Sequence, residues 1–467
     1  MLSKGTEGIA QEYDVIVGGG GLGGLTAANV LAKAGHRVLL AEQHSQLGGL
    51  ATYFRRRGHI FDVALHGFPV GMTKTLRKYW SKEMAAQIIQ VKSVRFDNPQ
   101  FSLETTFTKE DFTEKLVGKF GLARTRVDAF YAELDGMNFY DEQRMTNREL
   151  FEKYFPGRND VVRLLMEPIT YANGSTLDEP ALTYGIVFSN FMSKGVYTFA
   201  GGTDRMLDMM EQELCANKAD VRICAKIDRV LVKGGRVAGA VINGQEVKAR
   251  AVLSNGNILG TIRDWIGEEH FKAEFIEKAR SLRLNTSSCQ VYMGFKKGSG
   301  FDFIGDLLFT STCPEFSPEK LIDKDVTSRT YSVYYPELRP GQHDYTVVAS
   351  MNARYEDWAS LSPESYRKEK QKLIDDTIAA LDKYIPDVAA KLDYTEAATP
   401  LTFKRYTLHG AGSSFGTKFE GLELSMKLPE QIGGIFHAGS VGIIMSGWLG
   451  AANYGVIVAN NIDKYLR

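Results

Sequence analysis

The stretch that decides the fold is DVIVGGGGLGGLTAANVLAKAGHRVLLAEQHSQLGGLATYFRRRGHIFD, residues 14–62. It opens on the apolar run Val15–Val17, which is typical of a buried parallel strand. Glycines follow, and from Leu25 apolar residues recur at helical spacing until Gly35 can end the helix. A second apolar run, residues 38–41, leads to Glu42. The order predicts a strand, a glycine turn, a helix and a second strand of a parallel α/β unit.

The glycines between the first strand and the helix fit the pattern GxGxxG at Gly19, Gly21 and Gly24. The first glycine permits a tight turn, the second lets the backbone approach a diphosphate, and the third lets helix and strand pack closely. Amide groups at the start of the helix favour the phosphate charge. Glu42 follows at about the 20-residue spacing at which an acid binds ribose hydroxyls. The stretch therefore predicts a dinucleotide site.

A second glycine pair, Gly48–Gly49, follows the acid within a short loop and lets the chain pass close to the same diphosphate. This arrangement resembles the FAD superfamily of amine oxidases, phytoene desaturases, carotenoid isomerases and retinol saturases. The ending FDxxxH, with Phe61, Asp62 and His66, is most similar to the retinol saturase and carotenoid isomerase branch. The resemblance is strong at both ends of the chain and patchy in the middle.

The resemblance implies an α/β fold: a Rossmann-like FAD-binding domain of the glutathione-reductase and amine-oxidase type, with an inserted α+β substrate domain. We assign residues 1–70, 196–285 and 396–467 to the first and residues 71–195 and 286–395 to the second. A helix beginning near Ile443–Ile444 is expected to direct its dipole at the flavin, and the backbone of Ile227 to meet the adenine. The expected FAD-binding residues are Gly19, Gly21, Leu22, Gly23, Gly24, Glu42, Gln43, Gly48, Gly49, Leu50, Ile227, Gly439, Ser440, Ile443 and Ile444.

Two positions depart from the family pattern. The family commonly has Asp where this chain has Ser440, which can hydrogen-bond a ribityl hydroxyl but brings no charge. Amine oxidases often have arginine where this chain has Leu50. Both departures argue against the amine oxidase branch.

Composition sets further limits. Lys and Arg balance Asp and Glu at 56 each, so no nucleic-acid partner is expected. No window of about 18 apolar residues predicts a membrane span, and the four scattered cysteines predict no metal site. The polar start of the chain predicts a cytoplasmic location. The basic and aromatic run 74–80 is either an interfacial helix in peripheral contact with a membrane or an ordinary solvated helix face.

Apolar residues in the middle of the chain either line a tunnel for substrate or belong to the core. They are Leu164, Leu165, Met166, Ile169, Tyr171, Tyr184, Ile186, Phe188, Phe191 and Met192. The resemblance implies an enzyme that acts on double bonds of a long apolar isoprenoid, with hydride exchange at flavin N5 and an unknown electron donor or acceptor. His66 is the first catalytic prediction, since imidazole titrates near neutral pH, although a structural histidine beside the cofactor is an equal alternative. Arg405, Tyr406 and His409 come next, just before the last flavin element.

Three classes of function remain open at this point. The first is desaturation, saturation or isomerisation of a carotenoid-like or retinoid-like lipid, which all need the same flavin and the same tunnel. The second is a flavin oxidase or dehydrogenase of another lipid or an amine. The third is a non-catalytic prenyl-lipid carrier of the GDP-dissociation-inhibitor type, which shares the fold.

Overall fold

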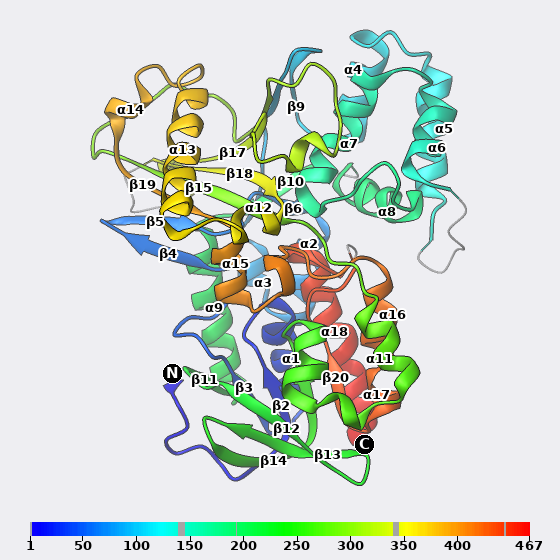
Figure 1. The fold of residues 1–467 in the computed structure, drawn as a ribbon, viewed down its shortest axis with the longest axis vertical. Helices are drawn as coiled ribbons and strands as arrows, with labels where there is room; N and C mark the ends of the chain where they lie inside the picture. The colour runs from blue at the N-terminus through cyan, green and yellow to red at the C-terminus, as the bar shows by residue number, and fades with distance from the viewer. Residues whose placement is uncertain (1, 139–144, 193, 340–344, 443–444) are drawn as a thin grey trace.

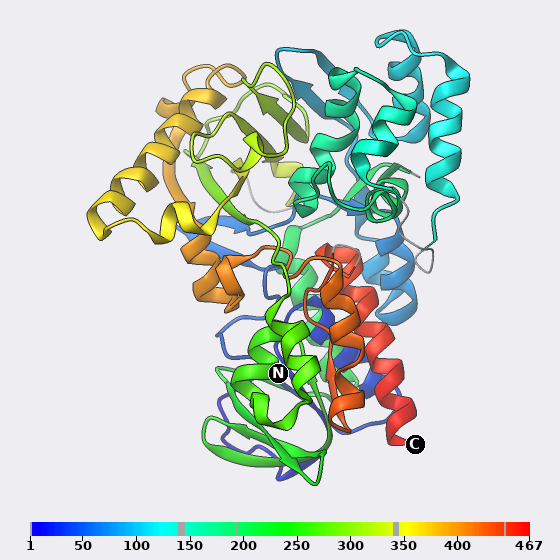
Figure 2. The ribbon, with the colours of Figure 1, turned by 45° about the vertical axis from the view of Figure 1, so that its right-hand side comes forward.

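A computed structural model describes residues 2–138, 145–192, 194–339, 345–442 and 445–467. The chain forms two lobes, and both termini lie in the lower lobe of Figure 1. The first, middle and last parts of the sequence all return to this lobe, where they appear blue, green and red in Figures 1 and 2. The upper lobe is built from the segments between them.

An eight-stranded sheet forms the centre of the lower lobe. Its strands are β1 (Ser3–Lys4), β2 (Glu12–Gly18), β3 (Val38–Ala41), β11 (Asp220–Ile223), β12 (Ile227–Lys233), β13 (Arg236–Ile242), β14 (Gln245–Ser254) and β20 (Ile435–His437). β2 pairs in parallel with β3 and with β14, β11 and β1 extend the parallel part, and β20 pairs with β14. β12 and β13 add an antiparallel meander. The predicted Rossmann-like sheet is confirmed.

Two helices meet across the first glycine turn. α1 (Leu22–Lys33) and α18 (Gly447–Leu466) lie side by side in both ribbon views. A Cβ on Gly455 would lie 2.3 Å from the Gly23 carbonyl oxygen, and one on Gly23 would lie 2.6 Å from the Ala438 oxygen. Such close approach requires glycine. The beginning and the end of the chain are therefore in direct contact.

Glycines with positive φ flank the start of α18. The expected start at Ile443–Ile444 lies outside the described residues, and the helix begins at Gly447. Gly442 has a φ of 55° and Gly447 a φ of 67°, which an α-helix cannot continue through. Ser446 before the helix is extended and donates its hydroxyl to the Gly442 carbonyl oxygen at 2.7 Å.

The upper lobe contains a seven-stranded, mostly antiparallel sheet in the order β19-β15-β18-β17-β16-β8-β9. Helices α4–α8 pack at one end of it and α13 at the other (Figure 1). This is the expected α+β insertion. The elements are β8 (Val94–Asp97), β9 (Ser102–Thr105), α4 (Lys109–Gly118), α5 (Arg124–Asp135), α6 (Asn147–Tyr154), α7 (Asn159–Asn173), α8 (Ala181–Met192), β15 (Ser287–Phe295), β16 (Leu307–Ser311), β17 (Ser328–Tyr334), β18 (Thr346–Ala353), α13 (Pro363–Leu381) and β19 (Leu392–Ala398).

The remaining helices and strands lie outside the two large sheets. They are β4 (Tyr53–Arg56), β5 (His59–Asp62), β6 (Phe68–Pro69), α2 (Gly71–Tyr79), α3 (Lys82–Ala85), β7 (Ile88–Gln90), β10 (Val196–Phe199), α9 (Gly202–Ala216), α10 (Ile258–Gly260), α11 (Ala273–Arg280), α12 (Tyr355–Ala359), α14 (Val388–Lys391), α15 (Pro400–Thr407), α16 (Glu420–Met426) and α17 (Leu428–Gln431).

α2 and α3 differ from the assigned domain limits. We placed residues 71–195 in the substrate domain, but the apolar side chains of α2 and the residue after it are buried in the lower-lobe core (Met72, Leu76 and Trp80). Trp80 donates its indole N–H to the Thr26 hydroxyl at 3.4 Å. The basic side chains of α2 are exposed on its other side. This arrangement favours the ordinary solvated helix face over the interfacial helix.

A buried ion cluster joins the lobes. Arg339, which follows β17, forms ion pairs with Asp62 at the end of β5 and with Asp204 of α9. The other Asp62 oxygen accepts a hydrogen bond from the Thr203 amide at 2.8 Å. Arg339 is 5% exposed and Asp62 is 1% exposed, so each charge depends on its partners. Asp62 of the FDxxxH ending therefore helps to hold the two lobes together.

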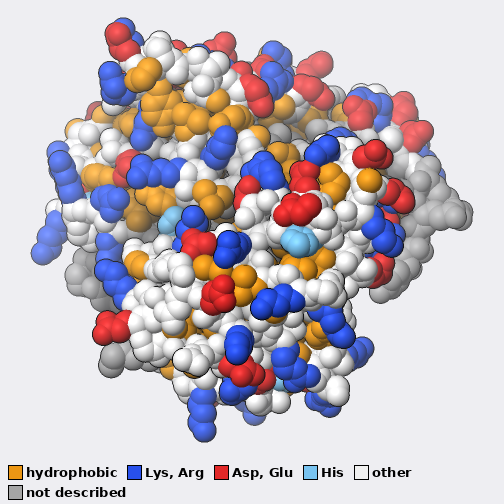
Figure 3. Space-filling model, turned by 60° about the horizontal axis from the view of Figure 1, so that its bottom comes forward, with side chains coloured by type: hydrophobic (Ala, Val, Ile, Leu, Met, Phe, Trp, Pro, Cys, Tyr) orange, Lys and Arg blue, Asp and Glu red, His pale blue; other side chains and the backbone are white. Residues whose placement is uncertain are grey.

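The surface charges, the apolar character of the helices and the grouping of possible metal ligands bear on other classes of function. On the face shown in Figure 3, basic and acidic side chains are interspersed. Within the described ranges no helix combines the length and apolar character of a membrane span. In the same ranges no three His, Cys, Asp or Glu side chains are grouped as metal ligands would be.

Candidate functional site

A cavity of about 1580 Å³ extends between the lobes. Its lower part is lined by Gly19, Gly21 and Gly23 of the first glycine loop and by Gly48 and Gly49 of the second. Ser440, far away in the sequence, lines the same cavity. The glycine-bearing ends of the chain therefore converge on one site.

The two glycine loops support each other through backbone contacts. The Gly19 amide donates to the Ala41 carbonyl at 2.8 Å, and the Gly48 amide donates to the Gly20 carbonyl at 2.7 Å. A Cβ on Gly49 would lie 3.1 Å from the Gly21 Cα. A Cβ on Gly48 would lie 2.4 Å from the Ala51 carbonyl oxygen, so the two loops pack too closely for side chains at these positions. The loops form a bare backbone cradle of the kind that binds a diphosphate.

Glu42 lies at the edge of this cradle. Its carboxylate accepts hydrogen bonds from the Gly20 amide at 2.7 Å and from the His44 amide at 2.8 Å. The side chain is buried yet lines the cavity. Backbone donors thus fix its orientation where a ribose would lie beside a diphosphate held by the loops.

Asn255 connects the first loop to the last part of the chain, and sequence reasoning missed it. Its backbone amide donates to the Gly18 carbonyl at 2.8 Å, and its side-chain amide donates to the Ala438 carbonyl at 2.7 Å. A Cβ on Gly21 would lie 2.6 Å from the Asn255 Oδ1. The available signal was its place directly after β14, since parallel strands bring their carboxyl ends to one edge of the sheet.

The structure separates the expected FAD-binding residues into three groups. Gly24 and Gly439 lie behind the lining: a Cβ on Gly24 would lie 2.1 Å from the Gly19 oxygen, and one on Gly439 would lie 1.9 Å from the Gly256 oxygen. Ile443 and Ile444 lie outside the described residues. The individual binding roles stay predictions. The residues that line the cavity are Gly19, Gly21, Leu22, Gly23, Glu42, Gln43, Gly48, Gly49, Leu50, Ile227 and Ser440.

His437 at the end of β20 supports the turn that carries Ser440. Its Nε2 lies 3.0 Å from the Gly256 carbonyl oxygen, so this nitrogen carries the proton and donates it. Its Nδ1 therefore accepts from the Ser425 hydroxyl, 2.6 Å away. Burial lowers the pKa of His437 to about 4.

This lowered pKa predicts a loss of stability in acid. A histidine that is neutral in the folded chain and titrates near 6.5 when unfolded makes the unfolded state bind more protons between pH 6.5 and 4. We expect His437 to lower the free energy of unfolding by about 2 kcal/mol between pH 6.5 and 5. Urea unfolding of the wild type and His437→Gln at both pH values measures this. An equal pH dependence in the two proteins would contradict it.

His66 lines the cavity between two serine hydroxyls of the upper sheet. Its Nδ1 lies 2.6 Å from the Ser332 Oγ and its Nε2 lies 3.0 Å from the Ser350 Oγ. Burial lowers the pKa of His66 to about 4, so the ring is neutral near pH 7. One nitrogen then donates and the other accepts. Ser350 and Gln290 also line the cavity, and the Gln290 Nε2 donates to the Ser350 Oγ at 3.4 Å.

The other predicted catalytic residues lie elsewhere on the lining. Arg405 and Tyr406 are exposed at the rim of the cavity, where the Tyr406 carbonyl accepts a hydrogen bond from the His44 Nε2 at 2.7 Å. His409 is buried and donates from Nδ1 to the Ser413 carbonyl at 2.9 Å; burial lowers the pKa of His409. Contact with His44, two residues after Glu42, places Arg405 and Tyr406 on the nucleotide side. Their catalytic roles stay predictions.

The upper part of the cavity is an apolar chamber. Its walls are Ile169 and Tyr171 of α7, Ile186 and Phe191 of α8 and, from the sheet, Val94, Leu307 and Phe309. The remaining apolar residues predicted for a tunnel are buried in the core of the upper lobe and do not line the cavity (Leu164, Leu165, Met166, Tyr184 and Phe188). The side chain of Met192 is not among those described.

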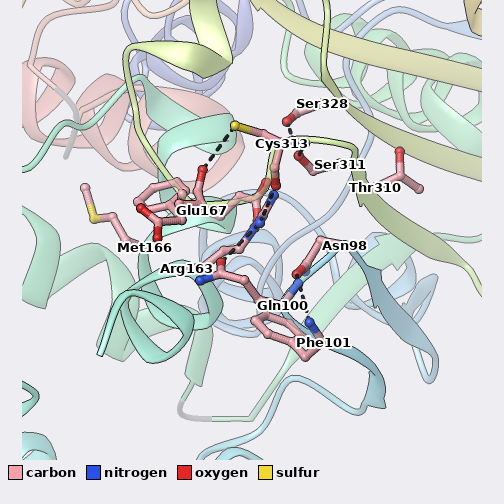
Figure 4. A network of polar contacts seen from close by, with 12 residues as sticks. Asn98, Gln100, Phe101, Arg163, Met166, Glu167, Thr310, Ser311, Cys313 and Ser328 are labelled. Carbon is pink, nitrogen blue, oxygen red and sulfur yellow. Dashed lines mark hydrogen bonds and ion pairs between the residues drawn. The ribbon is translucent and has the colours of Figure 1, made fainter. Parts of the chain in front are cut away.

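A buried polar network holds α7 in place behind this chamber (Figure 4). Arg163 donates to Glu167 at 3.1 Å, to the Gln100 side chain at 3.1 Å and to the Cys313 carbonyl at 2.9 Å. Burial raises the pKa of Glu167 to about 7, against the opposing effect of Arg163. The network fixes the helix turn that presents Ile169 and Tyr171 to the cavity.

The sheet that closes the chamber is more polar than the helix residues from which the apolar tunnel was predicted. Alternate residues of neighbouring strands face the cavity, and on β15, β17 and β18 they are uncharged and polar. They are Ser288, Gln290, Thr330, Ser350 and Asn352. The chamber therefore combines apolar walls with a polar floor.

These features fit FAD. The backbone cradle suits its diphosphate, Glu42 suits a ribose, and the cavity exceeds the roughly 300–1,000 Å³ of ordinary small-molecule sites. The remaining space leads from the cradle into the apolar chamber.

Most of this chain is similar to a family of flavin-containing proteins. The family described as flavin containing amine oxidoreductase matches residues 22–440. A chloroplastic prolycopene isomerase from Daucus carota is 24% identical over 460 residues, which cover 87% of this chain and 72% of that protein. An all-trans-retinol 13,14-reductase from Danio rerio is 23% identical over 476 residues, with 87% and 78% covered.

A solved oxidoreductase from Methanosarcina mazei superposes with a TM-score of 0.67 at 16% identity, over 96% of this chain and 99% of that one, which shows a shared fold. Since the family match spans most of the sequence, this chain belongs to the flavin-containing amine oxidoreductase family and is an FAD-dependent oxidoreductase.

Proposed function

We propose that the enzyme carries out redox chemistry on the double bonds of a long apolar isoprenoid. The observation that carries this proposal is the continuity of one cavity from the glycine cradle to the apolar chamber. The names of the relatives, a prolycopene isomerase and a retinol reductase, support an isoprenoid with conjugated double bonds. Leu50 packs against the aromatic cluster around Phe61 and Tyr292, so the arginine of amine oxidases is replaced here by an apolar contact.

FAD supplies the capacity to accept or deliver two electrons. The chain's own residues do the rest: the glycine loops hold the diphosphate, and the walls of α7 and α8 orient the lipid and exclude water. His66 holds a proton on one ring nitrogen and accepts a hydrogen bond at the other. Burial lowers its pKa to about 4, well below the near-neutral titration on which the catalytic prediction rested, so near pH 7 the ring acts as a neutral hydrogen-bond donor and acceptor between Ser332 and Ser350.

Anaerobic spectroscopy tests the proposal. The purified holoenzyme is mixed with all-trans-retinol, with prolycopene, or with putrescine as an amine control, and the flavin absorbance is followed. Bleaching by an isoprenoid means dehydrogenation, and turnover of an isoprenoid only after chemical reduction means saturation or isomerisation. Bleaching by putrescine alone, or binding of isoprenoid without any turnover in either redox state, would contradict the proposal.

His66→Gln is expected to lower turnover of the isoprenoid about a hundredfold while FAD stays bound, because a positioned acid or base is removed. His270→Gln, an exposed histidine of the lower lobe, is the control and should turn over as the wild type does. Flavin content and single-turnover rate are measured for both. Unchanged turnover in His66→Gln with full FAD would assign His66 a structural role.

A further inference from the structure

We infer that Arg405 supplies the positive charge that faces the diphosphate of FAD. A diphosphate is strongly anionic, and Glu42 adds a carboxylate at the same end of the cavity. The two glycine loops offer only amide groups, while Leu50 and Ser440 bring no charge. The site therefore needs a cation from another part of the chain.

Few cationic side chains line the cavity. They differ in whether an acidic side chain lies close to them. Arg56 lies 3.9 Å from Glu396, and Lys226 lies 4.0 Å from Asp228. Lys370 is carried by α13 of the upper lobe. Arg405 has no acidic partner within 4.0 Å in the part of the chain that the structure describes; its guanidinium lies 5.8 Å from the centre of the Tyr406 ring.

A line of contacts runs from the helix of Arg405 to the phosphate cradle. The Tyr406 carbonyl accepts from His44 at 2.7 Å, and the two rings lie 5.7 Å apart. The His44 amide donates to Glu42, which in turn accepts from the Gly20 amide. α15 is therefore docked on the loop that carries the ribose-binding acid.

The other side of the same segment is also fixed. The carbonyl of Leu408, just after α15, accepts from the Asn257 side chain at 2.8 Å. Asn257 follows Asn255, which bridges the first glycine loop. Arg405 thus lies in a segment that is hydrogen-bonded to the nucleotide-binding lobe at Tyr406 and at Leu408. Its side chain lines the cavity. A guanidinium in this place can bind two phosphate oxygens at once.

Cofactor binding by the apoenzyme tests this inference. FAD is removed, and its Kd is measured by flavin fluorescence for the wild type, Arg405→Met, Arg405→Lys and Lys404→Met. Lys404 is the matched control, because it neighbours Arg405 but its Nζ donates to the Tyr355 hydroxyl at 2.8 Å. Thermal unfolding of each apoenzyme checks that the fold is kept.

We expect Arg405→Met to raise the Kd about tenfold at 0.1 M salt, with Arg405→Lys in between and Lys404→Met unchanged. The difference should shrink at 1 M salt, where the screening length falls from about 10 Å to about 3 Å. An unchanged Kd in Arg405→Met would overturn the inference. So would a loss of affinity that is equally large in Arg405→Lys, or one that is the same at 0.1 M and 1 M salt. A change in the KM for isoprenoid with no change in Kd would assign Arg405 to the substrate instead.

Discussion

A Gly23→Val variant is expected to purify without flavin and to bind added FAD about a thousandfold more weakly. The Cβ would lie 2.6 Å from the Ala438 carbonyl oxygen and 2.8 Å from the Asn255 Nδ2. The Asn255 side chain donates a hydrogen bond to the Ala438 carbonyl, which holds both groups in place. The first glycine loop therefore has to move to make room for the valine side chain. Movement of the loop removes several amide-to-phosphate hydrogen bonds, each worth roughly 1.5–3 kcal/mol.

Gly118→Ala is the matched control for this change. Gly118 lies in α4, has no positive φ, and has open space where a Cβ would be placed. FAD content and Kd should stay at the wild-type values in this variant. Normal flavin binding by Gly23→Val would show that the two ends of the chain do not share the cofactor.

Arg339→Met is expected to lower the free energy of unfolding by about 3–5 kcal/mol, because it leaves the buried carboxylate of Asp62 without its cationic partner. Arg55→Met provides the comparison, since Arg55 contacts the same Asp204 at 3.4 Å but its side chain is 60% exposed. That change should cost less than about 1 kcal/mol. Urea unfolding measures both.

If Arg339→Met and Arg55→Met lowered the free energy of unfolding equally, burial would not decide how strongly the ion cluster holds the lobes together. A second test is the double variant Asp62→Asn with Arg339→Met. The two losses should not add, because the residues act on one cluster. Additive losses of the free energy of unfolding would contradict an ion cluster in which Asp62 and Arg339 act together between the lobes.

Local sequence was sufficient to predict the nucleotide-binding half. The run from Val15 to Glu42 contains a strand, a turn, a helix and a second strand, and each follows from residues close in the chain. The approach of the glycine loops was also predictable, because Gly19 with a φ of 103° and Gly49 with a φ of 61° occupy a conformation that favours glycine.

Contacts between distant segments were not predictable in the same way. Arg339 and Asp62 are far apart in the sequence, and neither occurs in a pattern that names its partner. α2 has a basic, aromatic sequence that fits either a membrane surface or an ordinary solvated helix face, and only its packing on the lower-lobe core, including the contact with Thr26 of α1, shows that Trp80 is buried. The polar floor was missed because the tunnel was inferred from helices, while the floor comes from alternate residues of three strands.

A crystal structure of the flavin-loaded enzyme with a bound isoprenoid is the most direct test of the shared cavity. We expect the diphosphate to accept hydrogen bonds from the amides of the Gly19–Gly24 loop, the flavin end to lie near Ser440, and the lipid to lie against α7 and α8. Density for the cofactor away from the Gly19 loop, or a lipid bound outside the chamber of Ile169 and Phe191, would contradict the proposed site.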